Sequence, residues 1–261
     1  MILYFSATGN SRHVALAIAA ARHDVALSME EAASPYTARL DLSGHREWGF
    51  VFPSYFGGLP AYVLQYLHRM EVLCRPDEQP FTYCVATYGS VVGNPAAQLR
   101  RELKACGLSL HAAYAVRMVD VYTPLFDVTN EAANLRREQE AELQIAEIVK
   151  AIDQRRTHRV GPLSALIAHC EYGFYRRARR TSAFRLEAAR CTGCGLCARH
   201  CPEHAIEPDA EGHPVWTKPQ CSLCLRCLHH CPAFAIDRGP TSRRHGRYLY
   251  GRRAAASEAE E

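Results

Sequence analysis

Eight of the twelve cysteines in this chain stand in two copies of one pattern, CxxCxxCxxxCP. The first copy begins at Cys191 and the second at Cys221. In this spacing three thiolates hold one 4Fe-4S cluster, and the fourth reaches a neighbouring cluster. The pattern therefore predicts two 4Fe-4S clusters. We expect one on Cys191, Cys194, Cys197 and Cys231, and the other on Cys221, Cys224, Cys227 and Cys201.

The residues between the cysteines differ in the two copies. Gly193 and Gly195 relieve crowding where the backbone passes inorganic sulfide. The second copy has Leu223 and Leu225 instead, so its loop must be built without glycine. The repeat also includes Ala205-Ile206 and Ala235-Ile236, which indicates two similar halves related by an approximate two-fold axis.

Zinc and disulfides are the alternatives for these cysteines. Zinc sites usually take two separated pairs of ligands, which is not this pattern. Disulfides require an oxidising compartment, and nothing in the sequence indicates export. The last quarter of the chain resembles the bacterial two-cluster ferredoxins. The other four cysteines lack mutual spacing, and we interpret them as free thiols in a reducing cytoplasm: Cys74, Cys84, Cys106 and Cys170.

Before the cysteines, β-prone segments alternate with amphipathic ones, which predicts a parallel α/β sheet with helices on both faces. Expected strands lie at 2–5, 24–29, 48–52, 81–87 and 108–118. Expected helices lie at 13–22, 61–70, 95–106 and 128–152.

Three strand ends carry loops rich in Gly, Ser and Tyr, and such carboxyl ends meet at the ligand crevice of an open α/β sheet. The first loop ends a strand and opens a helix, an arrangement that binds phosphate. The alternative is an ordinary capped helix with Asn10 or Ser11 as N-cap. Neither a P-loop nor GxGxxG is present. The loop residues are Ser6, Thr8, Gly9, Asn10, Ser11; Pro53, Ser54, Tyr55, Phe56, Gly57, Gly58; and Thr87, Tyr88, Gly89, Gly93, Asn94.

Residues 1–150 resemble flavodoxins, and Ser6–Ser11 look like their FMN phosphate loop. The resemblance implies a doubly wound five-stranded sheet of order 2-1-3-4-5 and FMN as cofactor. It also implies that Tyr55, Phe56 or Tyr88 stacks on the isoalloxazine ring, and that the Gly57-Gly58 peptide flips toward the flavin N5.

The whole chain is similar to the EFR1 family, in which a flavodoxin-like domain is fused to a two-cluster ferredoxin. Phe184-Arg-Leu resembles that family's lead-in strand, and Arg247-Tyr248 its tail, whereas Asp120–Pro124 fits a loop without an assigned role. The expected domains are a flavodoxin-like FMN-binding domain (1–153), a basic helical linker (154–183), a small α+β ferredoxin domain (184–240) and a C-terminal tail (241–261), disordered from 254.

Charge is concentrated in one stretch. Residues 150–190 carry 10 Lys+Arg and 3 Asp+Glu. Nucleic acid is one candidate partner for this stretch, but no nucleic-acid motif accompanies it, so we favour a solvated linker that lies against an acidic surface or a redox partner. No signal peptide is recognisable, and no apolar run is long enough for a bilayer, which predicts a cytoplasmic protein. The apolar stretch 160–175 is expected to be a helix packed between domains.

These features predict an iron–sulfur flavoprotein that transfers electrons between two 4Fe-4S clusters, FMN and an unidentified protein or small-molecule partner. One alternative is an FMN-dependent reductase of a quinone or another small organic acceptor. Another is a redox sensor or scaffold with an empty flavodoxin-like domain. Arg190, Arg199 and Arg226 are expected to raise the cluster potentials, and the alternative is that they are only solvated charges. The histidines beside the ligands are expected to be exposed: His200, His229 and His230. No acid–base residue is identified in the sequence.

Overall fold

The computed structural model describes residues 1–32, 38–73, 80–156 and 172–252. They divide into two compact units. The flavodoxin-like unit comprises Met1–Ser6, Asn10–Met118 and Arg136–Arg176. The cluster unit comprises Ala7–Gly9, Val119–Leu135 and the chain from Arg177 onward. The expected disorder after 254, and parts of the expected linker and interdomain helix, lie outside the described residues.

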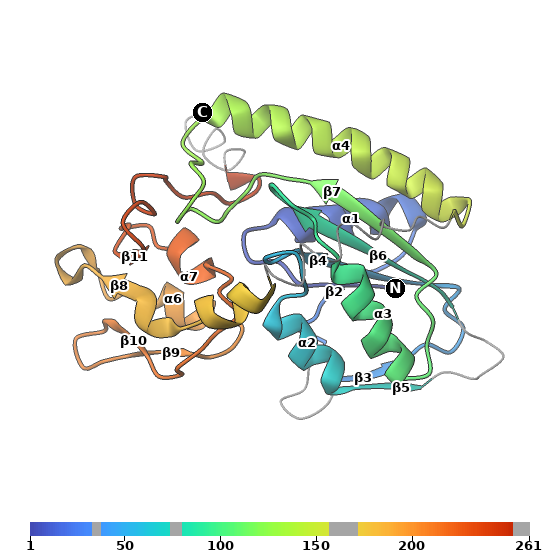
Figure 1. The fold of residues 1–261 in the computed structure, drawn as a ribbon, viewed down its shortest axis with the longest axis horizontal. Helices are drawn as coiled ribbons and strands as arrows, with labels where there is room; N and C mark the ends of the chain where they lie inside the picture. Colours follow the sequence, from blue (N-terminus) through green and yellow to red (C-terminus); the bar gives the residue numbers. More distant parts are fainter. Residues whose placement is uncertain (33–37, 74–79, 157–171, 253–261) are drawn as a thin grey trace. The chain divides into compact units, whose positions relative to one another are not determined.

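The flavodoxin-like unit is built on a five-stranded parallel sheet of order β2-β1-β4-β6-β7. Numbered along the chain, these strands have the predicted order 2-1-3-4-5, so the expected fold class is confirmed (Figure 1). The strands are β1 (Ile2–Tyr4), β2 (Ala26–Ser28), β4 (Glu47–Pro53), β6 (Phe81–Tyr88) and β7 (Ala112–Arg117).

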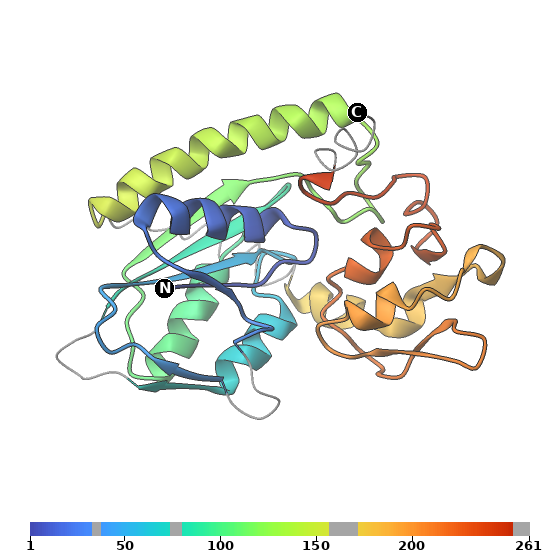
Figure 2. The same ribbon diagram turned by 180° about the vertical axis from the view of Figure 1, so that it is seen from behind.

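Helices cover both faces of this sheet, with α1 and α4 on one side and α2 and α3 on the other (Figures 1 and 2). Asn94 caps α3 by accepting from Ala97 N at 3.1 Å. The last helix begins three residues later than expected because Asn130 accepts from Ala133 N in the same way. The helices are α1 (Asn10–Arg22), α2 (Ala61–His68), α3 (Pro95–Ala105) and α4 (Glu131–Asp153).

A second, two-stranded parallel sheet was not predicted. It pairs β3 (Ala38–Asp41) with β5 (Met70–Leu73). Residue 70, expected to end a helix, instead begins β5. Four-residue strands give too little periodicity to be distinguished from a helix end, so long-range pairing decides their conformation.

The core of the flavodoxin-like unit lies on both faces of the central strands. Phe50, Val51 and Phe52 of β4 are all fully buried. A Cβ at Gly49 would lie 2.7 Å from the ring of Tyr83, so glycine is required there for the strands to pack. Burial on both faces explains why β4 reads as a continuous apolar run rather than an alternating one.

The cluster unit repeats a small α+β motif, as expected. Helices α6 (Leu196–Arg199) and α7 (Arg226–His229) occupy equivalent places in the two copies of the cysteine pattern. Two antiparallel pairs flank them: β9 (Ile206–Pro208) with β10 (Pro214–Trp216), and β8 (Phe184–Leu186) with β11 (Ile236–Arg238). The single-turn 3₁₀ helices η1 (Thr181–Ala183) and η2 (Ala188–Arg190) flank β8.

Two further segments complete this unit. Val119 and Val128 form a small core with Tyr248 of the tail, and Val121 of the loop 120–124 packs against it. Val128 N donates to His245 O at 2.9 Å. The loop whose role the sequence left open therefore packs against the C-terminal tail. In the described ranges, no helix is long and apolar enough to cross a membrane.

Candidate metal centres and flavin loops

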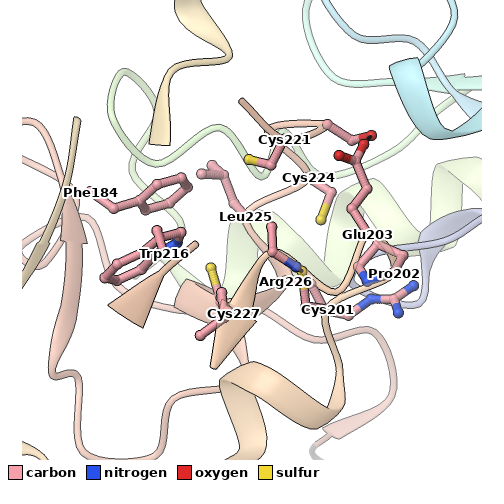
Figure 3. A pocket seen from close by; sticks show the side chains of 13 residues that line it. Phe184, Cys201, Pro202, Glu203, Trp216, Cys221, Cys224, Leu225, Arg226 and Cys227 are labelled. Carbon is pink, nitrogen blue, oxygen red and sulfur yellow. Dashed lines mark hydrogen bonds between the residues drawn. The ribbon is translucent and has the colours of Figure 1, made fainter. Parts of the chain in front are cut away.

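Two cavities in the cluster unit gather the cysteines of the repeated pattern. In both, three cysteines come from one copy and the fourth from the other. One is lined by Cys221, Cys224, Cys227 and Cys201, and we call it the second-copy cavity (Figure 3). The other, the first-copy cavity, is lined by Cys191, Cys194, Cys197 and Cys231.

This crossed arrangement is the one expected from the cysteine spacing. The ten cysteines in the described part of the chain are all free, so none is tied up in a disulfide there. Among the described residues, no three His, Cys, Asp or Glu side chains form a site for a single metal ion. The donor set is instead four cysteine sulfurs that line one cavity, the soft donors that an iron–sulfur cluster takes.

The loops of the two copies share an unusual backbone. Gly193 and Gly195 have φ of 66° and 70°, and Leu223 and Leu225 have φ of 52° and 58°. For a residue with a side chain, this left-handed conformation costs about 1–2 kcal/mol of conformational free energy. The leucines are each only 3% exposed, so their burial offsets the strain.

Backbone amides point at the sulfurs in matching places. Ala205 N donates to Cys201 Sγ and Ala235 N to Cys231 Sγ, both at 3.3 Å. Each alanine follows a residue with positive φ, His204 or Phe234. Hydrogen bonds to ligand sulfur are one way in which a protein raises a cluster's potential.

Burial and charge distinguish the second-copy cavity. Burial raises the pKa of Cys224 to about 12 and that of Cys221 to about 11. Arg226, which also lines this cavity, opposes the rise at Cys224 and donates from Nη1 to His200 O at 3.0 Å. These sulfurs would therefore be thiols without a bound cation and become thiolates when iron binds.

The three arginines expected near the clusters differ in their surroundings. Arg226 is buried, whereas Arg190 and Arg199 are exposed. Arg190 also pairs with Glu187 at 3.2 Å. Solvent screens an exposed charge, so of these three arginines Arg226 would have the greatest effect on the potential of a bound cluster. Sequence reasoning missed a carboxylate at the same cavity: Glu203 is buried and accepts a hydrogen bond from the Ser222 hydroxyl.

The expectation of exposed histidines is wrong for His229, which has 0% exposure. Its Nε2 donates to Val121 O at 2.8 Å, and its Nδ1 accepts from Tyr248 N at 3.2 Å. Burial lowers the pKa of His229 to about 4, so the ring is neutral with its proton on Nε2. This side chain joins the second copy to the loop 120–124 and to the tail.

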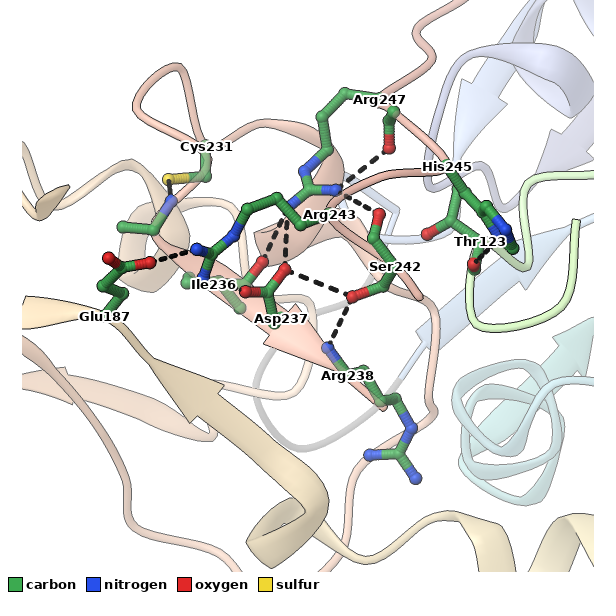
Figure 4. Close-up of polar contacts among 12 residues, drawn as sticks. Thr123, Glu187, Cys231, Ile236, Asp237, Arg238, Ser242, Arg243, His245 and Arg247 are labelled. Atoms are coloured by element: carbon green, nitrogen blue, oxygen red, sulfur yellow. Dashed lines mark hydrogen bonds and ion pairs between the residues drawn. The ribbon is translucent and has the colours of Figure 1, made fainter. Parts of the chain in front are cut away.

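A buried arginine fixes the tail to the first-copy cavity (Figure 4). The Arg247 side chain is only 2% exposed and donates to Ile236 O and Ser242 O, each at 2.8 Å. Asp237 pairs with Arg247 at 3.4 Å and also with Arg243. Ile236 lines the cavity, so the tail supports its wall. In the sequence, only the resemblance of Arg247-Tyr248 to the EFR1 tail indicated that Arg247 is important.

In the flavodoxin-like unit, hydrogen bonds join the three predicted loops. Ser11 Oγ lies 2.7 Å from Thr87 Oγ1, which links the first loop to the third. Ser54 N donates to Thr87 O at 2.7 Å and Asn94 N to Gly57 O at 2.8 Å, which link the second to the third. The sheet therefore brings the loops together at its carboxyl edge, as predicted.

The start of α1 has the character of an anion site. Asn10 and Ser11 are buried polar residues in its first turn, which contains no acidic residue. A helix N-terminus offers backbone N–H donors and a favourable dipole to phosphate. These residues fit the phosphate of FMN by their chemistry.

Part of this first loop belongs to the cluster unit. Tyr250 N donates to Thr8 O at 2.8 Å. Gly9 has φ of 99°, and a Cβ there would lie 2.9 Å from Tyr250 Cβ. Glycine is therefore required at position 9 for the tail to pack, whether or not phosphate binds.

The second loop contains a tight turn. Tyr55 N donates to Gly58 O at 2.9 Å, and Gly58 N donates to Tyr55 O at 3.0 Å. A flip of the Gly57-Gly58 peptide would break the bond from Gly58 N and the bond to Gly57 O from Asn94. The expected flip toward the flavin thus has a cost that the sequence did not reveal.

Comparison with known proteins identifies one domain. Residues 190–235 match the family model described as a 4Fe-4S dicluster domain. No curated protein matches the chain.

Several solved structures are similar at low identity. A putative flavoprotein from Bacteroides uniformis is 14% identical with a TM-score of 0.35, and the match covers 55% of this chain and 95% of that one. A flavodoxin from Streptococcus pneumoniae is 15% identical with a TM-score of 0.33, over 56% and 97%. Rubredoxin:oxygen oxidoreductase from Desulfovibrio gigas is 17% identical with a TM-score of 0.33, over 57% and 35%. The fold of the first unit therefore rests on its own sheet order, and the second unit contains a 4Fe-4S dicluster domain.

Proposed function

We propose that this chain is an iron–sulfur flavoprotein of the EFR1 type, which transfers electrons between two 4Fe-4S clusters, FMN and a redox partner. The observation that carries the proposal is the crossed grouping of cysteines. Each cavity holds three cysteines of one copy and one of the other. Two zinc sites or two independent metal loops would not need this exchange.

The chain's own residues set the conditions for electron transfer. Four thiolates per cavity bind one cluster, and the amides of Ala205 and Ala235 stabilise negative charge on the ligand sulfurs. The residues around the start of α1 would bind the FMN phosphate, and the loops at 53–58 and 87–94 would flank its ring. Bound in these places, the clusters supply single electrons and the flavin accepts one or two.

Anaerobic reconstitution tests the proposal. We expect about eight iron and eight sulfide atoms per chain and about one flavin, measured on one sample together with EPR of the reduced clusters. Replacement of Ser6 and Thr8 together should release flavin and leave iron content unchanged.

Two results would favour one of the alternative functions instead. Full iron content without any flavin in the wild-type chain would favour the redox sensor or scaffold. Turnover of one small organic acceptor with a specific product would favour the reductase. A carrier should instead reduce several acceptors without a specific product.

A further inference from the structure

The turn at Tyr55–Gly58 requires support from other parts of the flavodoxin-like unit. Phe56 has φ of 48°, a left-handed conformation that is unfavourable for a residue with a side chain. Gly57 follows with φ of 72°. Two consecutive left-handed residues persist only where surrounding contacts hold them.

Three aromatic residues at 172–175 supply these contacts. The ring of Phe56 lies 5.6 Å from that of Tyr175, at 25°, and 5.8 Å from that of Phe174. The ring of Tyr172 occupies the space beside Gly58, where a Cβ would lie 2.3 Å from it. Tyr172 Oη donates to Leu59 O at 3.1 Å. The turn is therefore held on its side-chain and backbone atoms alike.

Tyr175 also caps the helix that follows the turn. The N-cap residue of α2 is Pro60, which makes no side-chain cap. Ala61 N, the first amide of α2, donates instead to Tyr175 Oη at 3.1 Å. Tyr175 is only 1% exposed, so this amide would be left without solvent if the hydroxyl were removed. A residue over a hundred positions away thus completes the start of α2.

We propose that Tyr172 and Tyr175 are positioning residues for the isoalloxazine ring of the flavin. They hold the turn that carries Tyr55 and Phe56, and one of these two residues or Tyr88 is expected to stack on the ring. The inference rests on the proposed flavin site.

The chain continues from these tyrosines into the cluster unit. Four residues after Tyr175, Arg179 Nε donates to Cys221 O at 2.7 Å, and Cys221 N donates to Arg179 O at 3.1 Å. Cys221 lines the second-copy cavity. Arg179 therefore holds the backbone at Cys221 within the cluster unit.

The test is the pair of variants Tyr172→Phe and Tyr175→Phe in the full chain with its clusters. Each removes one hydroxyl and keeps the ring. We expect the flavin dissociation constant, measured by fluorescence titration with FMN, to rise about fivefold in each. The visible circular dichroism of bound FMN should also change, because the ring lies in an altered site.

A matched control is Tyr114→Phe. Tyr114 Oη donates to Arg156 O at 2.5 Å in the same unit, so the variant also loses one hydrogen bond to a backbone carbonyl. Its FMN affinity and dichroism should be those of the wild type. Amide hydrogen exchange at residues 58–61 should accelerate in the two test variants and not in the control.

The possible outcomes separate the two proposals. If the wild type binds FMN and the two variants bind it equally well with unchanged dichroism, the positioning role is refuted while the flavin proposal stands. If the wild type binds no FMN, the proposed function fails and the positioning role with it. Faster exchange at 58–61 together with weaker FMN binding supports both.

Discussion

In the first copy of the cysteine pattern, Gly193 and Gly195 stand where the second copy has Leu223 and Leu225, and all four residues have positive φ. The first loop is open: Thr192, Gly193 and Cys194 are exposed. The second is closed, with Ser222, Leu223 and Leu225 buried. One backbone shape is therefore made in two ways. Glycine makes it without strain, and leucine makes it with strain that burial offsets.

The difference shows that cysteine spacing determines the path of the backbone, whereas the residues between the cysteines determine its surroundings. Position 199 in the first copy is an exposed arginine, and position 229 in the second is a buried histidine. The loop of the first copy is thus exposed to solvent, and the loop of the second is packed among other segments of the cluster unit. The predictions below test this comparison from the largest effect to the smallest.

The largest effect concerns the exchange of the fourth cysteine. Each cavity should lose its cluster when one of its cysteines is removed, because a cluster needs four thiolates. The double variant Cys201→Ser with Cys221→Ser changes one cavity only, so about half of the iron should remain. The double variant Cys201→Ser with Cys191→Ser changes both cavities, so nearly all of the iron should be lost.

Iron and sulfide analysis of anaerobically reconstituted protein measures this difference. If the fourth cysteine stayed with its own copy, the pair 201 and 221 would empty both cavities and the pair 201 and 191 only one. The opposite pattern of iron loss would therefore contradict the crossed assignment.

The next effect concerns the left-handed residue at position 223. Leu223→Ala should lower the free energy of unfolding by about 2–5 kcal/mol, because it removes a buried side chain and keeps the strain. Leu223→Gly should be more stable than Leu223→Ala by about 1–2 kcal/mol, because glycine relieves the strain. Denaturant unfolding of the reconstituted protein measures both.

Gly193→Ala is the matched control in the first copy. A Cβ there would meet its nearest atom at 3.6 Å, an ordinary contact, so only strain should count. We expect a loss of about 1–2 kcal/mol. A Leu223→Gly variant less stable than Leu223→Ala would show that backbone conformation does not limit this position.

Regular spacing made most of the fold predictable from the sequence. The parallel sheet and the grouping of loops at strand ends follow from patterns that recur within a few residues. The two copies follow from one cysteine spacing that appears first at Cys191 and again at Cys221. The short strands β3 and β5 escaped prediction because their pairing joins residues about thirty positions apart. The role of the loop 120–124 depends on His229 and Tyr248, which no local pattern connects to it.

The grouping of the candidate site residues was predictable to the same degree, and their roles stay predictions. Cysteine spacing named the eight cavity cysteines, and Gly- and Ser-rich strand ends named the loops. The sequence could not reveal that Tyr175 caps α2, because a tyrosine hydroxyl that bonds a distant amide leaves no periodic trace. Burial of Glu203 and Arg226 was also hidden, since charged residues are rarely buried without partners.

The smallest effect compares the two residues that end the short helices α6 and α7. His229→Ala removes a donor from Val121 O and an acceptor from Tyr248 N in a buried place, which should cost about 1–3 kcal/mol in free energy of unfolding. Arg199→Ala changes an exposed side chain and should alter it by less than about 0.5 kcal/mol.

Denaturant unfolding, with hydrogen exchange across residues 119–128, distinguishes the two variants. His229→Ala should accelerate exchange in that segment, because Val121 loses its link to the second copy. Arg199→Ala should leave it unchanged. Equal effects of the two substitutions would mean that the contacts of His229 with Val121 and Tyr248 do not hold the second copy in place.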